Sequence, residues 1–242
     1  MKTKITLLTP FLFAFSLYMN AQISNTAIDN RAGFAFDKII SKSRFSNKKN
    51  TVNLNNVVGH PYANKIFLPG KILFKNEKVN KLFLLRYNAN KDVIEVEVEK
   101  GVVDNVLMSK KISCQIGNDF YEYATYKNAE EDENETGYIK ILHKSENYIL
   151  FSKQKKTFYQ EKTSVDPLVP SHKAKYVGSE KFYLLEKSTN TAHSIKKKKY
   201  FLARINSSTT KKAMNKFIKK ERISFKKEND LIRMVKHYNK IK

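Results

Sequence analysis

Alternating apolar and polar positions dominate the chain from residue 57 onward. In Val93–Glu99, apolar residues alternate with three glutamates, and this period of two predicts a strand with one dry face and one wet face. Leu82–Tyr87 is largely apolar on both faces, which is typical of a strand that is covered on both sides. The pattern therefore predicts β structure at the start of the organised part of the chain.

Short polar turns separate further strand-like segments. Pro69-Gly70 predicts a type II turn, and Gly178-Ser179-Glu180 predicts a hairpin turn. Helical periodicity does not interrupt the strands, so we expect a mainly β fold built as an antiparallel meander. Its sheet is expected to be open, a sandwich or a partly open barrel. The other predicted strands are Ile72–Phe74, Val102–Met108, Lys111–Ile116, Phe120–Tyr126, Gly137–His143, Asn147–Lys153, Lys156–Gln160, Lys175–Val177, Lys181–Glu186 and Ala192–Lys196.

The periodicity changes near the C-terminus. Thr210–Arg222 places its apolar residues on one helical face, and Glu228–Ile241 carries a second apolar stripe. Acidic residues open the second segment and basic residues close it, an order that suits the helix dipole. Short amphipathic helices are marginal alone, so we expect this pair to pack on the sheet or on each other.

The first residues have the composition of an export signal. Lys2 and Lys4 precede the apolar run Ile5–Met19, and Ala21 supplies a small residue for cleavage. An uncleaved anchor is the alternative, although the run is short for a membrane span. We expect an exported protein, periplasmic or at the cell surface. The expected organisation is a signal peptide at 1–22, a weakly ordered segment at 23–56, an antiparallel β domain at 57–205 and a helical pair at 206–242.

The chain is strongly basic, with a formal net charge of +23. Only six of its 46 basic residues are arginine, whose planar fork suits specific base recognition, so specific nucleic-acid binding is not expected. An anionic envelope component, a lipid or a glycan, is the expected partner. The sharpest basic run is a candidate anion-binding site, with a solvated surface as the alternative; it consists of Lys196, Lys197, Lys198 and Lys199.

Signatures of catalysis or metal binding are weak. Asp132, Asn134 and Thr136 partly fit a calcium loop, but His143 stands where the bidentate glutamate belongs, which favours a solvated acidic turn. The histidines lack zinc-site spacing, and the chain has neither Gly-x-Ser-x-Gly nor a glycine-rich phosphate loop. The single cysteine, Cys114, is expected to be a buried apolar residue.

We therefore expect no catalytic residue, cofactor or metal. The favoured function is a non-enzymatic binding or structural protein of the envelope. One alternative is a carrier of a lipid-like ligand, held in a partly open sheet under a helical lid. Another is an enzyme whose site is assembled from distant strands.

Five short motifs stand out in the organised part of the chain. They are Gly59-His60-Pro61-Tyr62-Ala63-Asn64 with Phe67, Leu85-Arg86-Tyr87-Asn88, Gly137-Tyr138, Glu228-Asn229-Asp230-Leu231-Ile232 and His237-Tyr238-Asn239. Taken together, they resemble the motifs of a family of uncharacterised exported proteins of Bacteroidetes-type bacteria. The resemblance covers most of residues 57–242 and implies export and a β-rich body, with no assigned activity.

Two of these motifs are not explained by strand and turn patterns. Arg86 lies on an apolar strand, and a buried arginine needs a partner. The residues of the two motifs are candidates for a structural clamp or a ligand site, and the clamp is the reading to test first. They are Pro61, Tyr62, Asn64, Arg86, Tyr87 and Asn88.

Overall fold

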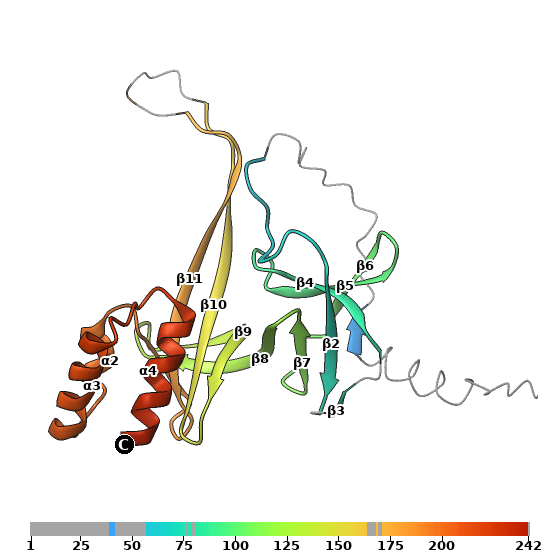
Figure 1. The fold of residues 1–242 in the computed structure, drawn as a ribbon. Helices are drawn as coiled ribbons and strands as arrows, with labels where there is room; N and C mark the ends of the chain where they lie inside the picture. Colours follow the sequence, from blue (N-terminus) through green and yellow to red (C-terminus); the bar gives the residue numbers. More distant parts are fainter. Residues whose placement is uncertain are drawn as a thin grey trace, which may run out of the picture.

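The computed structural model describes residues 39–41, 57–75, 77–78, 81–163, 168 and 171–241. The predicted signal peptide and nearly all of the segment at 23–56 lie outside these residues. Within them, a single continuous sheet of twelve strands forms the body of the protein, and short helices follow at the C-terminal end (Figure 1). The prediction of a mainly β fold with short C-terminal helices is confirmed.

The strands pair antiparallel, with one exception at β12, which runs parallel to β8. The order β1-β6-β5-β4-β2-β7-β8-β12-β11-β10-β9 departs from a simple meander, because β2 lies between β4 and β7. The strands are β1 (Ile40–Ser41), β2 (Leu68–Phe74), β3 (Glu77–Lys78), β4 (Phe83–Asn88), β5 (Val93–Glu99), β6 (Val102–Val106), β7 (Ile112–Ile116), β8 (Asp119–Asn128), β9 (Glu133–Lys144), β10 (Tyr148–Tyr159), β11 (Lys175–Glu186) and β12 (Thr191–Ser194).

The second half of the sheet closes into a ring of five strands. β8 pairs with both β9 and β12, so the path from β8 through β9, β10, β11 and β12 returns to β8. Every strand of this ring contributes to one buried cluster, in which the rings of Phe151 and Tyr183 stack with centroids 5.2 Å apart. The cluster consists of Tyr126, Ile139, Phe151, Tyr183, Leu185 and Ala192.

The first half of the sheet buries a separate core. Ile72, Leu85 and Ile94 are fully buried there, together with Cys114 of β7. Burial raises the pKa of the Cys114 thiol to about 12, so this group stays protonated at neutral pH. Cys114 therefore packs as a small apolar residue, as its strand context predicted.

Three helices lie against the outer face of the ring in the described part of the chain: α2 (Lys198–Leu202), α3 (Ser208–Lys220) and α4 (Glu228–Ile241). Their apolar residues pack with Leu150 of β10 and Leu184 of β11 in one buried cluster. The buried Lys140 of β9 pairs with Glu228, which joins the start of α4 to the sheet.

The helical region begins earlier than the expected boundary at residue 206. α2 falls inside the segment assigned to the β domain, because its lysine-rich sequence lacks an apolar period. Its anchor is Phe201, which is buried in the cluster beneath the helices. No helix of the described residues has both the length and the apolar character needed to cross a membrane.

Two predicted turns are wrong. Pro69 and Gly70 lie within β2, where a Cβ on Gly70 would stand 2.3 Å from the carbonyl oxygen of Gln115. The glycine thus permits close approach of β7 and does not supply a turn. Gly178 lies within the continuous strand β11, because β10 pairs along its full length and Lys156 stands opposite this glycine. The predicted strand at 156–160 is the end of β10.

Candidate functional site

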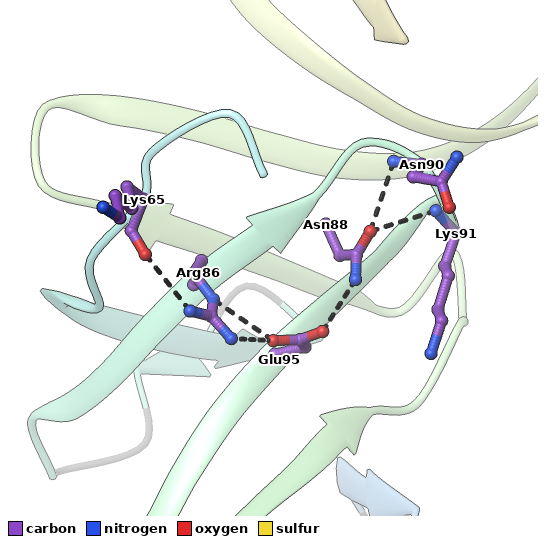
Figure 2. A network of polar contacts seen from close by, with 6 residues as sticks. All are labelled: Lys65, Arg86, Asn88, Asn90, Lys91 and Glu95. Atoms are coloured by element: carbon purple, nitrogen blue, oxygen red, sulfur yellow. Dashed lines mark hydrogen bonds and ion pairs between the residues drawn. The ribbon is translucent and has the colours of Figure 1, made fainter. Parts of the chain in front are cut away.

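The predicted clamp is centred on an ion pair between neighbouring strands. Arg86 of β4 stands opposite Glu95 of β5, and its Nε and Nη2 donate to Glu95 Oε2 at 3.2 and 2.5 Å (Figure 2). Asn88 Nδ2 donates to the other oxygen of the same carboxylate at 2.8 Å. Glu95 is only 8% exposed, so its charge depends on these donors.

Two aromatic rings lie against the Arg86 guanidinium. Its Cζ lies 3.4 Å from the ring centroid of Tyr62 and 4.1 Å from that of Phe67. This stacking adds cation–π attraction to the ion pair. Nη1 donates to the carbonyl oxygen of Lys65 at 3.1 Å, as Figure 2 shows.

The same contacts hold the arm at residues 57–67 on the sheet. Ala63 N donates to Tyr87 O at 2.9 Å, and Asn90 N donates to Pro61 O at 3.1 Å. Asn88 Oδ1 accepts from the backbone nitrogens of Asn90 and Lys91, which shapes the turn after β4 (Figure 2). All three guanidinium nitrogens thus donate to groups of the protein itself, and two rings lie against the Cζ atom. This geometry favours a structural clamp over a ligand site.

Two of the six candidate residues lie outside the clamp. Asn64 belongs to the arm, but within the described residues its side chain has no bond to this network. Tyr87 points from the opposite face of β4 into the core, where its ring centroid is 5.1 Å from that of Tyr121. Its hydroxyl donates to Asp92 Oδ1 at 2.7 Å.

Asp92 is the centre of a second polar network. Besides the Tyr87 hydroxyl, it accepts from Tyr138 N at 3.2 Å and from Lys153 Nζ at 2.8 Å. Lys153 Nζ also donates to Tyr138 O at 2.9 Å. Burial, followed by the nearby Asp92 carboxylate, raises the pKa of Tyr87, which keeps the phenol protonated as a donor. The network joins both halves of the sheet.

A cavity of about 450 Å³ lies between the ring and the helices. Leu184 of β11, Ile195 after β12 and Phe201 of α2 give it an apolar wall. The start of α3 at Ser207 and Tyr238 of α4 complete its lining. The cavity therefore has the construction that the alternative of a sheet with a helical lid requires.

Polar groups from three elements converge on this cavity. His193 of β12 lines it, and the Nδ1 atom of this residue is buried without a hydrogen-bond partner among the described residues. Burial and the nearby Arg204 lower the pKa of His193, with Glu186 acting in the opposite direction. Neither Arg204 nor Glu186 has an ion pair with another described residue. A lining that combines an apolar wall with such polar groups suits an amphipathic ligand.

Sequence reasoning did not single out these cavity residues. They come from β10, β11, β12 and the helices, and no local motif joins them. The one local signal is the spacing of Leu184 and Glu186, which places an apolar and an acidic residue on the same face of a strand.

The candidate anion-binding lysines stand at the start of α2. Lys196 pairs with Glu130 at 3.2 Å, whereas Lys197 occupies the N-cap position and Lys198 opens the helix. Lys199 Nζ lies 5.0 Å from the ring centroid of the half-exposed Tyr200. The four lysines are adjacent to the cavity in the chain but do not line it.

The acidic segment after residue 130 forms a turn and a strand. Asp132 adopts a φ of 55° and pairs with Lys127 at 2.7 Å. Asn134 and Thr136 lie in β9, where the hydroxyl of Thr136 is 3.0 Å from that of Thr125. The oxygens thus follow a strand and do not encircle a cation. No three His, Cys, Asp or Glu residues gather as a metal site within the described part of the chain.

Comparisons of the chain with known protein families, curated proteins and solved structures find no match. The resemblance to the family of exported proteins therefore stays a prediction. The function has to be inferred from the cavity and the surface of this protein alone.

Proposed function

We propose that the protein is an exported, non-enzymatic binding protein whose ligand is a small, lipid-like amphipathic molecule. The ligand occupies the cavity between the five-stranded ring and the helices. A volume of about 450 Å³ lies within the range of small-molecule sites in proteins, about 300–1,000 Å³. The ligand's apolar part packs against Leu184, Ile195 and Phe201.

The observation that carries the proposal is one cavity lining that joins an apolar wall to Arg204, which has no ion pair with another described residue. Arg204 adds a positive charge, so the favoured polar group is an acid. A single-chain amphiphile with a carboxylate meets both requirements.

Export is supported by the composition of the first 22 residues, with their lysines and apolar run. In the envelope, single-chain amphiphiles are available from the membrane itself. The proposal therefore joins two of the functions expected from sequence, a binding protein and a carrier of a lipid-like ligand.

The test is direct titration of the purified protein with medium-chain fatty acids. Binding is measured by calorimetry and, separately, by displacement of a fluorescent fatty acid. We expect saturable binding to one site. Ala203→Trp places a large ring at the cavity lining and should abolish binding. Arg204→Gln should weaken binding of the acid by about 10- to 150-fold and leave the uncharged alcohol unaffected, because a charge-assisted contact is worth about 1.5–3 kcal/mol.

Arg222→Gln is the matched control, because this exposed arginine lies outside the cavity lining. It should bind the acid as the wild type does. Equal binding by all three variants would place the ligand elsewhere, and a lack of saturable binding by the wild type would refute the proposed function.

A further inference from the structure

The chain has a basic stretch without acidic residues around helices α2 and α3. Residues 187–220 contain eleven basic residues and no acidic residue. Residues 38–76 also lack acidic residues, but they carry only eight basic residues over 39 positions, against eleven over the 34 positions of this stretch. The basic residues of the stretch are Lys187, Lys196, Lys197, Lys198, Lys199, Arg204, Lys211, Lys212, Lys216, Lys219 and Lys220.

Helix α3 separates its lysines from its apolar residues. At about 100° per residue, its five lysines fall within about one half of the helix circumference. Met214 and Ile218 are buried on the other half, where α3 packs against its neighbours. All five lysines are exposed. The packing of the helix therefore directs a basic face towards solvent.

These lysines are not neutralised by neighbouring carboxylates. In the basic stretch, the ion pairs between described residues are limited to Lys196 with Glu130. Glu221 follows α3 directly, but it pairs with Arg233 of α4 at 2.5 Å. The positive charge of α3 and of the start of α2 is thus available to an external anion.

We propose that this basic surface, made of Lys196–Lys199 and the five lysines of α3, docks on anionic lipid headgroups of a membrane. The proposal is independent of the cavity ligand. Clustered lysines near a membrane are attracted to anionic lipids, and the attraction is additive for each charge. Tyr200 lies among them with 40% of its surface exposed, and an amphipathic tyrosine suits the headgroup region.

Lysine content favours lipid headgroups over nucleic acid. Ten of the eleven basic residues are lysine, a compact charge that attracts phosphate without the bidentate geometry that reads bases. Docking through this surface also brings the cavity close to the membrane, since Arg204, Ser207 and Thr210 of its lining lie between the two groups of lysines in the chain.

The experiment is sedimentation of the purified protein with vesicles. We compare phosphatidylcholine alone with phosphatidylcholine containing phosphatidylglycerol, at physiological and at high salt. We expect binding to the anionic vesicles that is lost at high salt because the charges are screened. Substituting the five lysines of α3 by glutamine, another good helix former, should weaken this binding about tenfold or more.

The matched control changes the same number of charges elsewhere, by Lys75→Gln, Lys91→Gln, Lys100→Gln, Lys110→Gln and Lys111→Gln, all exposed in the first half of the sheet. It should retain binding within about threefold. If both variants lost vesicle binding equally, the net charge of the protein alone would explain the binding, and the proposal would be overturned. Absence of binding to anionic vesicles, or tighter binding of duplex DNA than of these vesicles through the same lysines, would also overturn it.

Discussion

Asp92 occupies the space that a side chain at residue 137 would need. A Cβ on Gly137 would stand 2.0 Å from Asp92 Oδ2 and 2.5 Å from Lys153 Nζ. The carboxylate cannot withdraw without losing the Tyr87 hydroxyl and the Tyr138 amide that it accepts from. The glycine of the Gly137-Tyr138 motif is therefore a packing requirement of the Asp92 network.

Gly137→Ala should destabilise the protein by about 1–3 kcal/mol, because overpacking displaces a bonded carboxylate. The free energy of unfolding in urea measures the effect. Gly178→Ala is the control, since its nearest contact is the flexible end of Lys156 at 2.9 Å. If Gly178→Ala lowered the free energy of unfolding as much as Gly137→Ala does, this explanation would be contradicted.

Arg86→Leu should cost about 3–5 kcal/mol, because it leaves the Glu95 carboxylate buried without its cation. Arg86→Leu combined with Glu95→Leu should be more stable than Arg86→Leu alone, since no uncompensated charge then remains. Chemical unfolding of the wild type and the variants tests this non-additivity. Unchanged stability in Arg86→Leu would favour the ligand-site reading of these residues.

His193 should make the stability of the fold depend on pH. Burial and Arg204 lower its pKa below the ordinary value of 6.5, and Glu186 offsets this only in part. As the pH falls, His193 is therefore protonated at a higher pH in the unfolded chain than in the folded protein. The free energy of unfolding should consequently decrease as the pH drops from about 7 to 5. His193→Gln should reduce this slope in urea unfolding measured across that range. If His193→Gln kept the full wild-type dependence of the free energy of unfolding on pH, other titratable groups would be responsible for that dependence.

The repeating patterns of the chain determined its elements. The apolar stripe in Glu228–Ile241 reflects which face of this helix is buried, and burial of one face is a local property of sequence. The period of two in Val93–Glu99 gave the strand correctly, but its predicted wet face is wrong at Glu95, which is buried against Arg86. The mainly β fold with short C-terminal helices could therefore be predicted. The helix α2 could not, because a single buried residue, Phe201, anchors it.

Only the tertiary structure decided how distant segments meet. Gly70 and Gly178 have turn-forming residue types but lie in strands, because β7 and β10 offer them backbone partners. The clamp and the cavity likewise depend on contacts between distant segments. The sequence by itself indicated that Arg86 needed a partner, whereas the strand register supplied Glu95. The cavity at His193 depends on ring closure and on helix packing, both of which are contacts between residues far apart in the chain.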